Sequence, residues 1–226
     1  MQIKILGIND PFPPISDANS NGLLAIGADL SPNRLILAYQ LGIFPWFSQD
    51  EPIMWYSPDP RFVLFPEDLI ISKSMRTYFN GNKFQVSFDS NFKEVIIMCS
   101  SIFRKGQWGT WITDDMIKAY IKLHELGCAH SVEVWKENNL VGGLYGISIG
   151  KIFFGESMFT LVPNASKYGF ISLVKKLMNE NYYLVDCQQK TEHLVSLGAK
   201  GIDRCDFKSY LDLNASHANN FAVWKS

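Results

Sequence analysis

Several features that would place a protein in a specialised class are missing from this sequence. The 226 residues include four cysteines, none at C-x-x-C spacing, so neither a disulfide framework nor a structural zinc site is expected. No apolar run reaches the roughly 18 residues of a membrane helix, and the proline-interrupted start, MQIKILGINDPFPP, is unlike a signal peptide. No sequence period recurs along the chain. We therefore expect a soluble, cytoplasmic, monomeric protein of one or two packed units, without a metal or a cofactor.

An excess of positive charge is also absent. The chain has 21 Lys and Arg against 22 Asp and Glu, a net charge of -1, so no global positive field recruits nucleic acid. One local exception lies between Asp68 and Asp89, where Lys73, Arg76 and Lys83 occur without an acid. This stretch is either a solvated face or a patch that contacts phosphates.

The composition and the pattern of the sequence change near residue 61. The first part is rich in Gly, Pro and aromatic residues and contains one clear helix, capped by Ser31, begun by Pro32 and stopped by Gly42. From Phe62 onward, strand and helix patterns alternate. We expect a small module with short strands and one helix over residues 1–61, and a larger domain over residues 62–226.

The pattern of the larger domain predicts an α+β fold with a mixed sheet flanked by helices. Thr113 caps a helix that Gly127 stops, and three strands over residues 129–136, 140–149 and 151–159 form two successive hairpins. A helix over residues 164–180, a strand over 182–188, a short helix after Thr191 and a last strand near 200–204 follow.

The strand ending in LVDCQ carries the most informative polar residues. Side chains alternate along a strand, so Leu184, Asp186 and Gln188 share one face and Cys187 lies on the other. Cys187 is then most simply a small core residue. A hydrolase dyad of Cys187 with His193 would need the strand to twist and is disfavoured.

Two further features have a structural and a functional interpretation. Trp46 and Trp111 lie in Gly- and Pro-punctuated stretches, where they either fill the core or offer stacking surfaces for bases. Glu156 interrupts the apolar strand KIFFGESMF, where a carboxylate is costly unless it is paired. It therefore predicts either a cation site or an internal ion pair.

Several separate blocks of the sequence closely resemble one family. The blocks include NGLLAIGADLSPNRLILAYQLGIFPWF, WYSPDPRFVL, HELGCAHSVEVW, LVGGLYGISIGKIFFGESMF, NASK and LVDCQ followed by HLVSLGA. They are similar to the leucyl/phenylalanyl-tRNA-protein transferases. Ala28 departs from the family pattern, because a second glycine is expected there, and Tyr56 stands where tryptophan is usual.

The resemblance implies a fold and an activity. It implies a C-terminal domain like the acetyl-CoA N-acetyltransferases, and transfer of Leu or Phe from aminoacyl-tRNA to proteins with an N-terminal Arg or Lys, which directs them to N-degron degradation. A CoA-dependent N-acetyltransferase and a non-enzymatic adaptor for basic N-termini remain alternatives. The glycine-free helix entry TLVPNASK disfavours a CoA pyrophosphate site.

For this activity we expect catalysis by Asp186 and Gln188, which would project together into a cleft, with the Gln188 amide donating to Asp186. Trp46 and Trp111 would stack on the terminal adenosine, and Lys73, Arg76 and Lys83 would contact tRNA phosphates. Glu156, or alternatively Asp186, would bind the cationic side chain of the acceptor. An apolar pocket for the Leu or Phe side chain is expected among Leu144, Phe153, Met158, Phe170 and Leu184.

Overall fold

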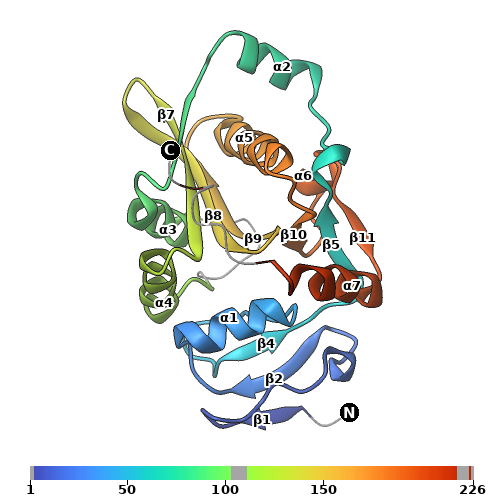
Figure 1. Cartoon of the computed structure of the whole chain (residues 1–226). Helices are drawn as coiled ribbons and strands as arrows, with labels where there is room; N and C mark the ends of the chain where they lie inside the picture. Colours follow the sequence, from blue (N-terminus) through green and yellow to red (C-terminus); the bar gives the residue numbers. More distant parts are fainter. Residues whose placement is uncertain (1–2, 103–110, 218–223, 225–226) are drawn as a thin grey trace.

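The structure is a computed structural model that describes residues 3–102, 111–217 and 224 (Figure 1). The N-terminal part forms a four-stranded sheet of order β1-β2-β4-β3, and α1 (Pro32–Gln40) lies against the rest of the molecule. The strands of this small sheet are β1 (Lys4–Leu6), β2 (Leu23–Gly27), β3 (Phe44–Pro45) and β4 (Met54–Tyr56).

The larger part is built on a seven-stranded sheet of order β11-β5-β10-β9-β8-β7-β6. Strands β7, β8 and β9 form the expected antiparallel meander, and β10 runs parallel to β9. The strands are β5 (Arg61–Leu64), β6 (Gln85–Phe88), β7 (Ala129–Lys136), β8 (Asn139–Ile149), β9 (Ile152–Thr160), β10 (Leu184–Gln188) and β11 (Lys200–Ile202).

Helices cover both faces of the larger sheet. α3 and α4 share a hydrophobic core with α1 on one face, and α5 packs with α2 on the other (Figure 1). The helices are α2 (Lys73–Asn80), α3 (Phe92–Ser101), α4 (Asp114–Glu125), α5 (Ala165–Asn179), α6 (Glu192–Val195) and α7 (Arg204–Asn214). Short 3-10 turns occupy Ile15–Asp17 and Pro66–Asp68.

The expected fold class, α+β with a small N-terminal module and a larger mixed sheet flanked by helices, is confirmed. Local chemistry explains why several predicted elements form. Pro32 begins α1 after Ser31, and the Thr113 side chain accepts from the Met116 amide at the start of α4. α4 ends shortly before Gly127, which has φ 75°. These signals are local, so the sequence alone identifies them.

One core connects the two sheets. Tyr39 of α1 and Trp55 of β4 belong to the same buried cluster as Tyr120 of α4 and Phe154 of β9. The expected division after residue 61 falls at the start of β5 and stays a prediction. None of the helices among the described residues is long and apolar enough to cross a membrane.

Candidate active site

A cavity of about 650 Å³ lies where β9 and β10 separate, and residues 44–46 of the N-terminal module form part of its wall. Its wall is mostly apolar, with a polar group at Glu156, Ser157 and Gln188. The other lining residues are Phe44, Pro45, Trp46, Ile102, Trp111, Leu144, Tyr145, Phe153, Gly155, Met158, Phe159, Thr160, Ser166, Phe170, Val185, Cys187, Gln189, Thr191, His193 and Leu194.

The separation of the two strands begins with a bend in β10. β10 pairs with β9 only as far as Asp186 opposite Phe154. Its pairing with β5 is irregular between Asp186 and Gln188, and Gln188 has φ 61°. This left-handed conformation is uncommon for a residue other than glycine, and strain of this kind is concentrated at functional sites.

Asp186 does not project into the cavity, so that part of the sequence prediction is wrong. Its side chain is fully buried and pairs with Arg61 of β5, through Nε to Oδ1 at 2.8 Å and Nη2 to Oδ2 at 2.6 Å. Arg61 also donates to the Gly42 carbonyl at 3.0 Å, and its guanidinium stacks over Phe44 and Phe207. Asp186 accepts the Gln188 main-chain N–H at 2.9 Å. A buried charge without a partner is costly, so Asp186 turns away from the cavity toward Arg61.

The side chain of Gln188 forms a hydrogen bond with Glu156, and only the main-chain N–H of Gln188 bonds to the Asp186 carboxylate. Its Nε2 donates to Glu156 Oε1 at 2.8 Å, which corrects the expected amide–Asp186 bond. Glu156 itself is the unpaired residue of a bulge in β9, because Tyr145 pairs with Ser157 while the next residue of β8, Gly146, pairs with Gly155. Bulges redirect side chains. Here the bulge directs Glu156 toward α1 and α4.

Two tyrosines complete the environment of Glu156. Tyr39 of α1 donates to Oε1 at 2.8 Å, Tyr120 of α4 donates to Oε2 at 3.1 Å, and the two hydroxyls contact each other. Burial raises the pKa of the Glu156 carboxyl to about 7, against the opposing effect of these hydrogen bonds. The carboxyl is thus held by three hydrogen bonds, while its burial disfavours the ionised form.

The predicted aromatic and apolar residues mostly meet in this cavity. Trp46, Trp111, Leu144, Phe153, Met158 and Phe170 all line it. Leu184 does not line the cavity. Its side chain is fully buried in the core cluster that connects the two sheets. The face of β10 that borders the cavity carries Val185 and Cys187. The assignment of Leu184 to the pocket is therefore wrong, because side chains alternate along a strand and Leu184 lies on the opposite face.

Cys187 lies on the cavity wall and not wholly in the core, as the alternation of side chains had suggested. The residue is half-buried, and its thiol donates to the Val185 carbonyl at 3.7 Å. Burial, and next the Asp186 charge, raise the pKa of this thiol far above its usual range. A thiolate is the reactive species, so Cys187 is poorly suited to nucleophilic catalysis although His193 also lines the cavity.

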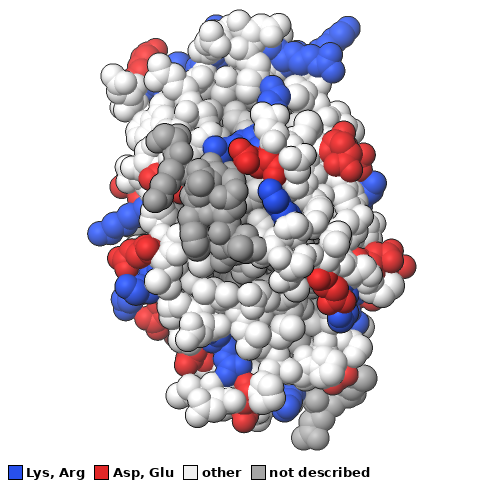
Figure 2. Space-filling view, in the orientation of Figure 1, with Lys and Arg blue, Asp and Glu red and all other residues white. Residues whose placement is uncertain are grey.

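Charge is mixed over the surface. Figure 2 shows Lys and Arg interspersed with Asp and Glu on the face it presents, without an extended field of one sign. Lys73 and Arg76 on α2 and Lys83 beyond it are exposed, away from the cavity wall. Their predicted contact with tRNA stays a prediction.

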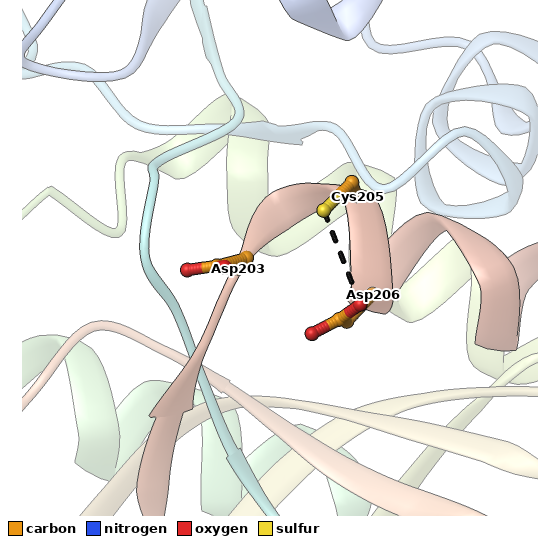
Figure 3. Close-up of side chains that lie close together, drawn as sticks. All are labelled: Asp203, Cys205 and Asp206. Carbon is orange, nitrogen blue, oxygen red and sulfur yellow. Dashed lines mark hydrogen bonds between the residues drawn. The ribbon is translucent and has the colours of Figure 1, made fainter.

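A second titratable cluster lies at the start of α7. Asp203, Cys205 and Asp206 place three possible ligand atoms within 4.8 Å of one another (Figure 3). All three residues are exposed, and the Cys205 thiol donates to Asp206 at 3.9 Å. Exposed acidic groups are common on protein surfaces, so this arrangement does not amount to a metal site.

Sequence reasoning missed three residues that shape the site: Arg61, Tyr39 and Tyr120. Each comes from an element far from β9 and β10 in the chain, and the two tyrosines lie on helix faces that pack into the core. The only available signal was the buried acid itself, since Glu156 within an apolar strand requires partners.

Comparison with known proteins identifies the family. The family model described as leucyl/phenylalanyl-tRNA protein transferase matches residues 63–212, and the model of its N-terminal domain matches residues 28–59. The chain belongs to this family. A leucyl/phenylalanyl-tRNA--protein transferase of Flavobacterium johnsoniae is 58% identical over 200 residues, which cover 88% of this chain and 94% of that protein. One of Christiangramia forsetii is 55% identical, over 89% of this chain and 96% of that protein.

Solved structures overlap less closely. A GCN5-related N-acetyltransferase from Kribbella flavida has a TM-score of 0.39 and 9% identity, over 74% of this chain and 59% of that chain. L-PGS from Bacillus licheniformis has a TM-score of 0.41 and 11% identity, over 68% and 49%.

Proposed function

We propose that this protein transfers leucine or phenylalanine from aminoacyl-tRNA to the α-amine of acceptor proteins that begin with Arg or Lys, and so marks them for degradation in the cytoplasm. Support comes from the name shared by its relatives. The observation that carries the chemistry is the Gln188–Glu156 hydrogen bond at the polar end of a mostly apolar cavity. In this proposal the reaction needs no metal or cofactor, and the protein acts as a monomer.

The donor ester is already activated, so the enzyme mainly aligns it with a neutral amine. An α-amine has a pKa of about 7.7 to 8.0 in water, so a usable neutral fraction exists near pH 7 without a strong base. Because Gln188 Nε2 is bound to Glu156, its carbonyl oxygen remains to accept an N–H of the attacking amine. Gln188 is therefore the proposed catalytic residue.

Asp186 acts through Gln188 in this proposal. It holds the main-chain N–H of Gln188 and fixes the bend of β10 while Arg61 neutralises its charge. Since Asp186 is fully buried, it serves as a positioning residue and electrostatic partner and does not touch the amine.

Glu156 remains the proposed site for the cationic end of the acceptor. A neighbouring cation favours the ionised carboxylate, so binding an Arg or Lys side chain lowers the raised pKa of Glu156. Glu156→Gln is expected to weaken discrimination between Arg-starting and Ala-starting peptides. The Leu or Phe side chain of the donor would enter the apolar part lined by Leu144, Phe153, Met158 and Phe170.

The two tryptophans on the cavity wall are the proposed stacking surfaces for the terminal adenosine. Stacking on an aromatic side chain contributes about 1 to 3 kcal/mol per base. Trp46→Ala is therefore expected to weaken binding of an aminoacyl-adenosine analogue by about tenfold or more. Unchanged affinity, measured by titration calorimetry, would move the adenosine elsewhere.

Transfer to a peptide tests the proposed function directly. An Arg-starting peptide is incubated with radiolabelled leucyl-tRNA, with acetyl-CoA, or with neither. We expect label on the peptide α-amine only with leucyl-tRNA. Acetylation of the peptide would instead indicate an N-acetyltransferase, and tight peptide binding without any transfer would indicate an adaptor.

A further inference from the structure

A tryptophan from near the end of the chain is packed into the larger domain beside the cavity. Trp224 is the last residue that the structure describes, and its side chain is buried. Its ring stacks on His130 of β7, with 4.1 Å between the ring centres and 12° between the planes. It also contacts the ring of Phe153 on β9, at 5.6 Å and 31°. The end of the chain is thereby connected to the strand that carries Glu156.

Phe153 lies between Trp224 and the cavity. Phe153 lines the cavity together with Leu144 and Phe170, whereas Trp224 and His130, which the structure also describes, are not part of the wall. Trp224 therefore lies behind Phe153, where a bound donor would not touch it.

The main chain of β8 supports Phe153 from a second direction. A Cβ atom at Gly146 would lie 2.6 Å from Cε1 and Cζ of Phe153, so the Phe153 ring occupies the space that a side chain at Gly146 would need. Gly146 pairs with His130 of the next strand. The Phe153 ring and the ring of Trp224 consequently meet side by side over neighbouring strands.

His130 gives Trp224 a fixed surface to stack on. Its imidazole is held at both nitrogens, by the Asp89 carboxylate at 2.7 Å and by the Gly127 carbonyl at 3.1 Å. Protein interiors are close-packed and transmit strain. The position of the Trp224 ring is therefore passed on to Phe153 and so to the cavity wall.

We propose that Trp224 sets the depth of the pocket for the donor side chain by holding Phe153 in place, and so disfavours tryptophan, whose ring system is larger than that of phenylalanine. The inference rests on the proposed function, because that function assigns the Phe153 wall to the Leu or Phe side chain of the donor. Trp224 is a positioning residue in this proposal, since it acts on the donor only through Phe153.

Removing the indole of Trp224 would leave a space behind Phe153. Neighbouring groups relax partly into such a space, so the Phe153 ring can move back and the pocket becomes deeper. An apolar pocket discriminates between side chains that differ by one methylene by about 10- to 200-fold. A deeper pocket therefore favours tryptophan and fits leucine less well.

The test compares one tRNA charged with either leucine or tryptophan, so that the two donors differ only in the side chain. For Trp224→Ala, we expect the ratio of kcat/KM for tryptophan to kcat/KM for leucine to rise about tenfold or more above the wild-type ratio. KM for the acceptor peptide should stay unchanged. Trp224→Phe, which keeps a flat ring, should restore most of the wild-type ratio, and Trp224→Leu should lie between the two.

Phe84→Ala is the matched control. Phe84 belongs to the same buried cluster as Phe153 and Trp224 and contacts the rings of Tyr78 and Tyr168, but it is not part of the cavity wall. Its replacement should lower the midpoint of thermal unfolding and leave the donor ratio unchanged. If Trp224→Ala does not fold, the donor ratio of Trp224→Leu decides.

An unchanged donor ratio in the folded Trp224 variants would overturn the inference. An equal change in Phe84→Ala would also overturn it, because a general loss of packing would then explain the result. The wild-type protein is the control for the proposed function. If it transfers no leucine, the proposed function fails and the inference fails with it; if it transfers leucine and the ratio is the same in all variants, only the inference fails.

Discussion

At the scale of single residues, Glu156 is a carboxyl that borders the cavity and whose pKa is raised. Its carboxyl is held by Tyr39, Tyr120 and Gln188, and burial raises its pKa to about 7. An unfolded glutamate titrates near 4.3. The native protein therefore keeps a proton on Glu156 over a pH range in which the unfolded chain has lost it.

The consequence is a defined dependence of stability on pH. A native pKa above the unfolded value contributes stability that is complete below pH 4 and is lost as the pH rises toward 7. We expect the difference in the free energy of unfolding between wild type and Glu156→Gln to shift against the wild type from pH 5 to pH 7.5. Urea unfolding at both pH values measures it, and a constant difference would mean that Glu156 titrates normally.

Ala28 is a second residue with an unusual conformation. It has φ 61°, and its N–H donates to the Leu6 carbonyl at 2.7 Å. Glycine, which the family pattern favours at this position, adopts positive φ without steric cost.

Ala28→Gly is therefore expected to stabilise the protein by about 0.5 to 1 kcal/mol, even though glycine increases the entropy of the unfolded chain. Thermal unfolding measures the change. Ala38→Gly in α1 is the matched control, because Ala38 lies within a regular helix and its replacement destabilises. A loss of stability from Ala28→Gly would contradict the interpretation.

At the scale of elements, the ion pair between Arg61 and Asp186 joins parts of the chain that are distant in sequence. It connects β5 to β10. Arg61 also donates a hydrogen bond to the Gly42 carbonyl after α1, and its guanidinium lies over the rings of Phe44 and Phe207 of α7. Phe44 lines the cavity. The pair thus holds one wall of the cavity and the bend that carries Gln188.

Breaking this pair should damage stability and positioning together. Asp186→Asn leaves the Arg61 charge buried without its partner and is expected to cost about 3 kcal/mol or more of unfolding free energy, as well as turnover. The double variant Arg61→Met with Asp186→Leu should recover much of the stability but not the activity. Urea unfolding and leucine transfer measure the two effects.

The exposed pair Lys208–Asp212 within α7 is the matched control. Both side chains are more than half exposed, so Asp212→Asn should change stability by less than about 1 kcal/mol. If Asp186→Asn were equally mild, the buried pair would have no special role.

At the scale of the whole molecule, two sheets close one cavity, and charge is distributed without a dominant sign (Figure 2). Any attraction for tRNA must then come from a limited group of exposed cations. Lys73, Arg76 and Lys83 are exposed and lie in a stretch without acids.

Replacing all three with glutamine is expected to raise KM for aminoacyl-tRNA and to reduce the slope of log KM against log salt by about one unit per lost phosphate contact. An aminoacyl-adenosine donor, which lacks those phosphates, should be used as before. The control replaces Lys118, Lys122 and Lys208, which changes the net charge equally at other surfaces. Equal effects on both donors would indicate damage to the fold.

The sequence by itself determined the elements that rest on local signals and the family to which the chain belongs. The caps at Ser31 and Thr113 and the meander of β7, β8 and β9 follow from neighbours in the chain. Only the tertiary structure decided where the polar residues point. Asp186 turned to Arg61, Gln188 to Glu156 and Glu156 to Tyr39 and Tyr120. Those orientations depend on partners from β5, α1 and α4, because a buried charge turns toward the nearest group that can neutralise or hydrogen-bond it. The spacing of residues in the sequence does not show which of these groups lie close together in the fold.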